Sequence, residues 1–253
     1  MSDLVHNEIA AKLRALTPAR VGLGRAGISL ETRDVFDFQL AHARARDAVH
    51  ARLDAAGLAA AIEADTNSAI LRLHSAAANR AEYLQRPDLG RRLHEDSRKL
   101  LSTQPSGADL VLIIADGLSS LAVERHVPAL LNQLLPRISV YSLAPICIVE
   151  QGRVAIGDEI GQTLGAQLSI VFIGERPGLS SPDSLGAYIT WQPRPGRTDA
   201  ERICISNIRT EGLSYTQAAT QLERVIAEAR DRQLTGVAAT SLPASLTAGE
   251  KNL

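Results

Sequence analysis

The stretch LVLIIADGLSS, Leu110–Ser120, decides the fold class of this chain. Its first six residues, Leu110–Ala115, are all apolar and rich in β-branched side chains, as in a strand that is buried on both faces of a parallel sheet. Asp116 and Gly117 follow as a turn, and Ser119 can cap the N-terminus of the helix that comes next. A buried strand that leads directly into a helix predicts an α/β fold.

Strands and helices alternate through the rest of the C-terminal half. Further strands are predicted over residues 139–149, 166–174, 185–191 and 202–208, and helices over residues 119–135, 153–165 and 214–233. This alternation predicts right-handed crossovers and a mostly parallel, Rossmann-like open sheet with flanking helices over residues 105–253. Residues 1–104 are predicted to form a helical N-terminal region, which includes a long helix over residues 32–53. The segment STQPSGAD, Ser102–Asp109, has the composition of a linker between the two.

The charge balance excludes broad classes of partner. The 27 Lys and Arg residues are matched by 28 Asp and Glu residues, so no net field favours nucleic acid or a membrane surface.

The longest apolar runs are too short to span a bilayer, and the polar start MSDLVHNEIA lacks a signal-peptide core. Cys147 and Cys204 lie far apart without a C-x-x-C motif, so neither a disulfide framework nor a cysteine zinc site is predicted. We expect a cytoplasmic protein.

The segment Gly22–Gly27 matches G-x-G-x-x-G, the spacing of a dinucleotide-binding loop. That chemistry needs a buried strand just before the first glycine, but Ile9–Leu16 has helical spacing there. A glycine-rich loop between two helices is therefore the preferred interpretation. A stand-alone NAD-binding oxidoreductase is the alternative function that this motif leaves open.

Four candidate segments follow predicted strands, where ligands bind in open α/β sheets. Glu175 stands in GERPGLSS, and a charge at a strand end needs solvent or a ligand. Cys204 stands in CISNIR and is either a small buried hydrophobe or a ligand contact. Val154 stands in EQGRVAIGDEIG and is either a core residue or a ligand contact. The turn after Asp116 is not a nucleophile elbow, since G-x-S-x-G would need glycine where Leu121 stands.

No metal site or catalytic constellation is predicted. His42 and His50 share a helix face, but no third group has ligand spacing with them. We therefore expect no metal and no catalytic residue on this chain.

Taken together, several segments resemble one family, the small subunits (light chains) of ethanolamine ammonia-lyase. The similarity covers roughly residues 18–235. It is carried, in chain order, by GRAG (24–27), HARARDAV (42–49), YLQRPDLGRRL (83–93), IADGLSS (114–120), GERPGL (174–179), SLGAY (184–188) and CISNI (204–208).

The resemblance implies a non-catalytic subunit of an adenosylcobalamin-dependent enzyme that converts ethanolamine to acetaldehyde and ammonium. In that family a large TIM-barrel subunit holds the substrate and the radical chemistry, and heterodimers assemble into a larger ring. The small subunit closes on the cofactor from its nucleotide-loop side, which implies cofactor contacts at Val154, Glu175 and Cys204 here. No D-x-H-x-x-G motif is present, which agrees with the base-on cobalamin of the family.

Three expectations follow from this resemblance. Residues 1–104 are expected to dock on the large subunit, since amphipathic helices outside a sheet must bury their apolar faces elsewhere. Arg176 or Arg209 could offset the phosphate of the cobalamin nucleotide loop. Gly22 lies close to Met1, whereas enteric relatives carry a long N-terminal extension linked to a bacterial microcompartment, so encapsulation is the alternative to a cytoplasmic location. A purely structural interaction module is a third possible function.

Overall fold

A six-stranded sheet forms the centre of the protein. The computed structural model describes residues 2–17 and 19–237. The strand order is β3-β5-β4-β6-β7-β8; the first four strands are parallel, β7 is antiparallel to β6, and β8 is antiparallel to β7. The strands are β3 (Ile70–His74), β4 (Leu110–Ala115), β5 (Ile146–Glu150), β6 (Leu168–Gly174), β7 (Leu185–Trp191) and β8 (Arg202–Ile208).

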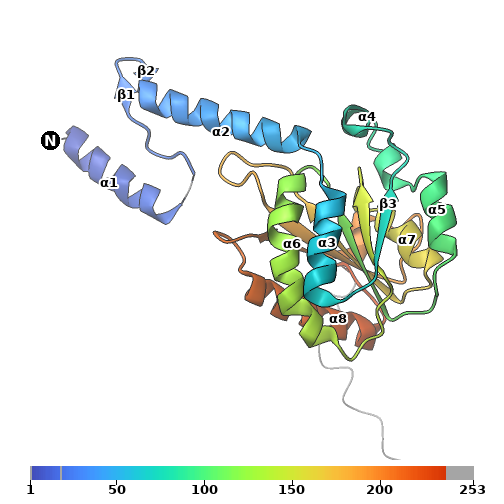
Figure 1. The fold of residues 1–253 in the computed structure, drawn as a ribbon. Helices are drawn as coiled ribbons and strands as arrows, with labels where there is room; N and C mark the ends of the chain where they lie inside the picture. The colour runs from blue at the N-terminus through green and yellow to red at the C-terminus, as the bar shows by residue number, and fades with distance from the viewer. Residues whose placement is uncertain (1, 18, 238–253) are drawn as a thin grey trace, which may run out of the picture.

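Helices cover both faces of the sheet (Figure 1). One face packs against α3 (Ala55–Thr66), α6 (Ser120–Leu134) and α8 (Tyr215–Arg232). The other face packs against α5 (Glu95–Ser102) and α7 (Ile156–Thr163). The short helix α4 (Arg80–Gln85) and the 3-10 turns at Leu89–Arg91, Leu135–Ile138 and Asp199–Glu201 complete the connections. The mixed α/β architecture with a mostly parallel sheet and flanking helices is the one that the sequence predicted.

Strand β4 lies in the interior of this sandwich, as its composition predicts. Leu110, Leu112 and Ile114 pack into the core on the α3, α6 and α8 side. Val111 and Ile113 pack into the core on the α5 and α7 side. All six residues of β4 are buried, because the strand has neighbours in the sheet on both edges and helices on both faces.

The prediction that residues 1–104 are helical is wrong at two places, a short strand pair within residues 25–30 and a longer strand. Ile70–His74 forms β3, which pairs in parallel with β5 at the edge of the sheet. Its residues are only partly apolar, so the sequence lacks the apolar run that is typical of a buried strand. Pairing with β5 determines the conformation of this segment. Two boundaries also differ: the strand predicted from residue 139 begins at Ile146, and the helix predicted to residue 53 ends at His50.

Residues 2–50 stand apart from the sheet and are called here the N-terminal arm. The arm consists of α1 (Ser2–Leu16), the two-residue strands β1 (Arg25–Ala26) and β2 (Ser29–Leu30), and α2 (Thr32–His50). In Figure 1 it extends sideways from the helices α3 and α6. Within the described residues, no helix is both long enough and apolar enough to cross a membrane.

A buried ion pair joins the end of the arm to the end of β4. Arg80 Nη1 lies 3.3 Å from Asp116 Oδ2 and donates to the Gly117 carbonyl at 2.8 Å. Arg80 Nε donates to the carbonyl of Val49, the second-last residue of α2. The Gly152 N–H donates to Asp116 Oδ1 at 3.0 Å. Burial raises the pKa of the Asp116 carboxyl to about 6, against the lowering effects of Arg80 and of the backbone N–H groups.

Replacing Arg80 with Met should destabilise the protein strongly at neutral pH. The substitution leaves the Asp116 carboxylate buried without its counter-charge, which costs about 3–5 kcal/mol of unfolding free energy. The folded-state pKa of Asp116 lies above its value in the unfolded chain, so its contribution to stability is regained as the pH falls through the folded pKa. We therefore expect a smaller loss at pH 5 than at pH 7, measured by urea unfolding at both values.

The matched control is Arg72→Met, which removes an exposed arginine from β3. This control should change the unfolding free energy by less than about 0.5 kcal/mol at either pH. An Arg80→Met protein that loses the same stability at pH 5 and pH 7 would show that the charge of Asp116 is not the reason.

Candidate functional site

The predicted site residues lie around the side of the sheet at which its parallel strands end. Strands β4, β5, β6 and β8 end on this side, and β7 begins there. Glu175 directly follows β6, and Val154 lies between β5 and α7. Cys204 lies within β8, directly opposite Tyr188 of β7. Val154 and Tyr188 both pack against the core on the α5 and α7 side of the sheet.

Two glycines fix the backbone where β4 and β6 end. Gly117 has a φ of 57°, and a Cβ there would lie 2.3 Å from the Gly174 carbonyl oxygen. A Cβ on Gly174 would lie 2.0 Å from the carbonyl oxygen of Ser119. The turn after β4 and the end of β6 therefore touch backbone to backbone, and the Leu118 N–H donates to the Gly174 carbonyl at 2.9 Å. The Ser119 side chain accepts a hydrogen bond from the Ala122 N–H and thereby caps α6, which is the role that the sequence predicts for it.

Glu175 is held in place by the two strands beside it. Its backbone N–H donates to the Ser184 carbonyl at 2.9 Å. Its Oε2 accepts hydrogen bonds from the Ser184 hydroxyl and from the Asn207 N–H, the latter at 3.2 Å. A Cβ on Gly186 would lie 3.0 Å from Glu175 Oε1, so the carboxylate rests directly over the backbone of β7. The side chain is half-buried and lines a cavity of about 430 Å³.

Cys204 is exposed, so its interpretation as a small buried hydrophobe is wrong. Its strand lies at the edge of the sheet, where alternate residues of one face are left open. Partial burial raises the pKa of the Cys204 thiol, a hydrogen bond with Tyr188 lowers it, and the charge of Glu175 raises it. The thiol is therefore protonated at neutral pH and is a poor nucleophile, which suits a packing contact better than covalent catalysis.

Two adjoining cavities meet at Val154. The cavity of about 430 Å³ reaches from Val154 to Glu175, and a larger one of about 820 Å³ extends from Val154 along α7. Arg153, Val154 and Tyr188 line both. Together these cavities form a continuous surface, called here the strand-end groove.

Tyr83 and Arg153 support the groove; Arg153 was noted in the sequence only as a loop residue beside Val154, and Tyr83 only within a family motif. Tyr83 is fully buried, and its hydroxyl donates to the Gly152 carbonyl at 3.1 Å. The guanidinium carbons of Arg80 and Arg153 lie 4.8 Å and 4.2 Å from the Tyr83 ring centroid. Both residues stand within or beside the quoted motifs YLQRPDLGRRL and EQGRVAIGDEIG. Spacing alone could not reveal that the two segments stack, because they are about 70 residues apart.

The glycine loop Gly22–Gly27 is not a dinucleotide site. The helix α1 precedes it in place of a strand, and residues 25–30 form the hairpin of β1 and β2. A Cβ on Gly24 would lie 2.1 Å from Glu31 Oε1, so a carboxylate already occupies the space beside the loop. The alternative of an NAD-binding oxidoreductase loses its structural basis.

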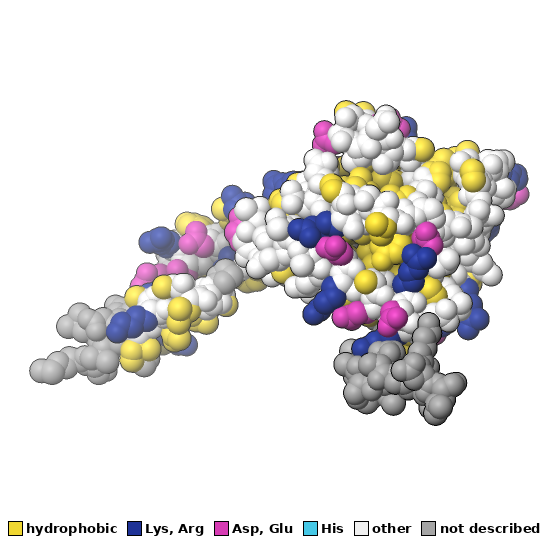
Figure 2. All heavy atoms as spheres, turned by 90° about the horizontal axis from the view of Figure 1, so that it is seen from below, with side chains coloured by type: hydrophobic (Ala, Val, Ile, Leu, Met, Phe, Trp, Pro, Cys, Tyr) yellow, Lys and Arg dark blue, Asp and Glu magenta, His cyan; other side chains and the backbone are white. Residues whose placement is uncertain are grey.

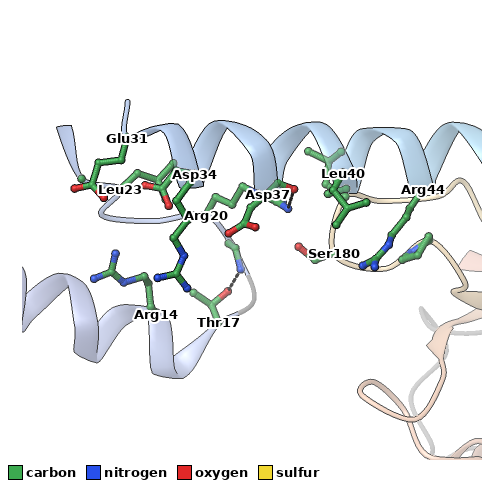
Figure 3. Close-up of a pocket in the computed structure, with 16 residues that line it drawn as sticks. Arg14, Thr17, Arg20, Leu23, Glu31, Asp34, Asp37, Leu40, Arg44 and Ser180 are labelled. Carbon is green, nitrogen blue, oxygen red and sulfur yellow. Dashed lines mark hydrogen bonds between the residues drawn. The ribbon is translucent and has the colours of Figure 1, made fainter. Parts of the chain in front are cut away.

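A third cavity, of about 830 Å³, lies beside this loop between the arm and the loop after β6. Figure 3 shows Arg14, Arg20, Asp34 and Asp37 in the gap between α1 and α2, with Ser180 near the far end. Both acids and arginines line it, with Glu31, Asp34 and Asp37 along α2 facing Arg14 and Arg20. It belongs to the arm and lies away from the strand-end groove.

Among the described residues, no group of three or more His, Cys, Asp and Glu side chains could hold a metal ion. Asp116, the acid at the end of β4, is buried and paired with Arg80. The groove thus offers hydrogen-bond acceptors, several arginine cations and apolar surface for binding.

Comparisons with known proteins agree on one family. The model of the family "Ethanolamine ammonia-lyase light chain (EutC)" matches residues 7–239. An ethanolamine ammonia-lyase small subunit from Pseudomonas fluorescens is 56% identical over 232 residues, which cover 89% of this chain and 84% of that protein. The small subunit from Xanthomonas campestris is 56% identical over 233 residues, covering 90% and 85% of the two chains. The one from Ralstonia nicotianae is 53% identical over 249 residues, covering 95% and 92%.

The match spans the arm, the sheet and all three predicted site residues, Val154, Glu175 and Cys204. The chain therefore belongs to the ethanolamine ammonia-lyase light-chain family.

Proposed function

We propose that this chain and a large subunit form an adenosylcobalamin-dependent ethanolamine ammonia-lyase, which converts ethanolamine to acetaldehyde and ammonium. In this proposal the chain closes over the base-on cofactor at the subunit interface. The observation that carries it is the strand-end groove, where Val154 and Glu175 line adjoining cavities and Cys204 stands opposite Tyr188.

The residues of the groove fit a cobalamin. The corrin ring is broad and carries amide side chains around its rim, so it needs a wide surface with acceptors for N–H groups and with apolar patches. The Glu175 carboxylate supplies acceptors at one end of the groove. Val154 and the protonated thiol of Cys204 supply weakly polar surface. The groove is open to solvent, as is required of a surface that a second subunit completes.

The chain's own residues bind and enclose, and the bound cofactor supplies a cobalt–carbon bond whose homolysis starts radical chemistry. Water must be excluded from such a site, which two subunits closing on each other achieve. Glu175 orients the cofactor through its amide groups while Ser184 and Asn207 hold the carboxylate in position. We assign the substrate site and every catalytic residue to the large subunit, in the cytoplasm, with heterodimers that assemble into a ring.

The docking role proposed for the N-terminal region falls on the arm. Most of the large apolar side chains that are exposed in the described part of the chain belong to residues 9–40. Figure 2 shows apolar side chains at the surface of the arm among arginines and acids. Exposed apolar surface of this extent is typical of a protein–protein contact. The exposed apolar residues of the arm are Ile9, Leu13, Leu16, Ile28, Leu30, Phe36, Phe38 and Leu40.

Substitutions of Glu175 should weaken cofactor binding in a graded way. Glu175→Gln keeps the shape and one acceptor but loses the charge, whereas Glu175→Ala leaves cofactor donors unpaired. A hydrogen bond to a charged group is worth about 1.5–3 kcal/mol, so we expect roughly ten- to hundredfold weaker adenosylcobalamin binding for Glu175→Ala. The affinity should fall in the order wild type, Gln, Ala, measured by titration of the reconstituted complex, with ethanolamine affinity much less affected.

Glu63 of α3 is the matched control, because it is an exposed glutamate far from the groove. Glu63→Gln and Glu63→Ala should bind the cofactor like the wild type. A Glu175→Ala complex that assembles normally and also binds like the wild type would remove Glu175 from the cofactor site.

The isolated chain should be catalytically silent. Among its described residues, no group of three or more His, Cys, Asp and Glu side chains could hold a metal ion, and the proposal assigns the catalytic residues to the large subunit. We expect no ammonia release from ethanolamine when only this chain and adenosylcobalamin are present, and release when the large subunit is added. Turnover by the chain alone would refute the assignment of catalysis to the partner.

Removing apolar side chains from the arm should weaken assembly. Leu16, Ile28 and Phe36 are 84%, 96% and 62% exposed, so replacing all three with Ser should leave the folded chain intact. Burial of one such side chain in an interface is worth about 1.5–3 kcal/mol, so the affinity for the large subunit should fall by at least about tenfold. Calorimetric titration of the two subunits measures it.

The control replaces three exposed apolar residues outside the arm, Leu100, Val140 and Leu143, with Ser. This variant should bind the large subunit like the wild type. Equal affinities for the arm variant and the control would place the docking surface elsewhere.

A further inference from the structure

The larger cavity of the strand-end groove is electropositive. Three acids line it, Asp158, Glu159 and Asp199, against six arginines. A surplus of positive charge in a concave surface raises the local concentration of anions. The arginines are Arg91, Arg92, Arg98, Arg153, Arg197 and Arg202.

Two of the three acids of this cavity are paired closely with particular arginines, and the third, Asp199, is exposed and lies 3.6 Å from Arg202 Nε. Asp158 pairs with Arg202 at 2.7 Å, and both side chains are almost fully buried. Glu159 pairs with Arg98. None of these pairs involves Arg153, whose charge is therefore not balanced by them.

Arg153 is held rigidly at the junction of the two cavities. Its guanidinium stacks on the Tyr83 ring. Its Cγ packs against the backbone of Gly90, since a Cβ on Gly90 would lie only 2.9 Å from it. Its backbone N–H donates to the Gly90 carbonyl at 2.7 Å. Within the described structure, Arg153 Nε is buried without a hydrogen-bond partner. Its Nη2 donates to the Tyr83 carbonyl at 3.4 Å. A guanidinium that is stacked and held in this way at the junction of two cavities is preorganised to bind a phosphate.

The start of α7 adds to the same field. Val154 and Ala155 lie between Arg153 and the first residue of α7, and both line the larger cavity. No side chain caps this helix N-terminus, and the two acids of its first turn, Asp158 and Glu159, are paired with Arg202 and Arg98. The partial positive charge of a helix N-terminus favours an anion beside it.

The two arginines suggested by the sequence are less suitable. Arg209 is buried, donates to Asn207 Oδ1 at 2.9 Å and lies 3.7 Å from Glu211 Oε2. Arg176 is exposed on the loop after β6 and lines only the smaller cavity.

We propose that Arg153, beside the N-terminus of α7, binds the phosphodiester of the cobalamin nucleotide loop. This subsite rests on the proposed function, because it requires the cofactor to occupy the strand-end groove. The phosphodiester is the anionic group of the nucleotide loop, and Arg153 supplies its counter-charge. The subsite also orients the cofactor, with its nucleotide loop toward α7 and a corrin edge toward Glu175.

The test compares three probes on the complex reconstituted from this chain and the large subunit. Cyanocobalamin carries the whole nucleotide loop, cobinamide phosphate keeps the phosphate without the nucleoside, and cobinamide lacks both. Calorimetric titration gives the three affinities without any need for turnover. For Arg153→Met we expect about ten- to hundredfold weaker binding of cyanocobalamin and of cobinamide phosphate, and an unchanged affinity for cobinamide.

The matched control is Arg72→Met, which removes an exposed arginine from β3, outside the groove, and should leave all three affinities unchanged. Arg176→Met tests the exposed arginine at the other end of the groove. An Arg153→Met complex that binds all three probes like the wild type, or loses all three equally, would overturn the subsite. A loss specific to Arg176→Met would overturn it in favour of that arginine. A wild-type complex that fails to bind cyanocobalamin at all would refute the proposed function itself, so the two failures are distinguishable.

Discussion

The buried pairing of Arg80 with Asp116 is the interaction on which the rest of this structure depends. A carboxylate at the end of the innermost strand has no access to water, so it must be neutralised from within the protein. Arg80 reaches it from α4 and also binds the carbonyl of Val49 at the end of the arm, while Gly152 donates from the loop after β5. One charge therefore joins the arm, α4 and two strand ends.

The same interaction extends into the groove through an aromatic ring. Tyr83 lies between the guanidinium groups of Arg80 and Arg153, and its hydroxyl binds the backbone beside Arg153. Residues that hold the fold and residues proposed to bind the cofactor are thus in direct contact. The exposed residues of β8 follow from its place as the last strand of the sheet. A subunit that encloses a cofactor jointly with a partner requires such an exposed surface.

The local pattern of the sequence determined the central architecture. The run Leu110–Ala115 favours a strand buried on both faces, because six consecutive apolar residues between turn signals are typical of one. The capping role of Ser119 and the positions of β6, β7 and β8 also followed from local pattern. The motif GERPG located Glu175 at a strand end, and the order of several such motifs was specific enough to indicate the family.

Tertiary structure alone decided the features that depend on contacts between distant segments. Ile70–His74 is a strand because β5 offers an unpaired edge, and Cys204 is exposed because β8 is the last strand of the sheet. The stacking of Arg153 on Tyr83 joins segments about 70 residues apart, and no periodicity records such a contact. The sequence by itself thus determined most of the helices and strands of the C-terminal half and the family to which the chain belongs. Only the folded chain decided which charges are paired, because pairing depends on which side chains the sheet and its helices bring within reach.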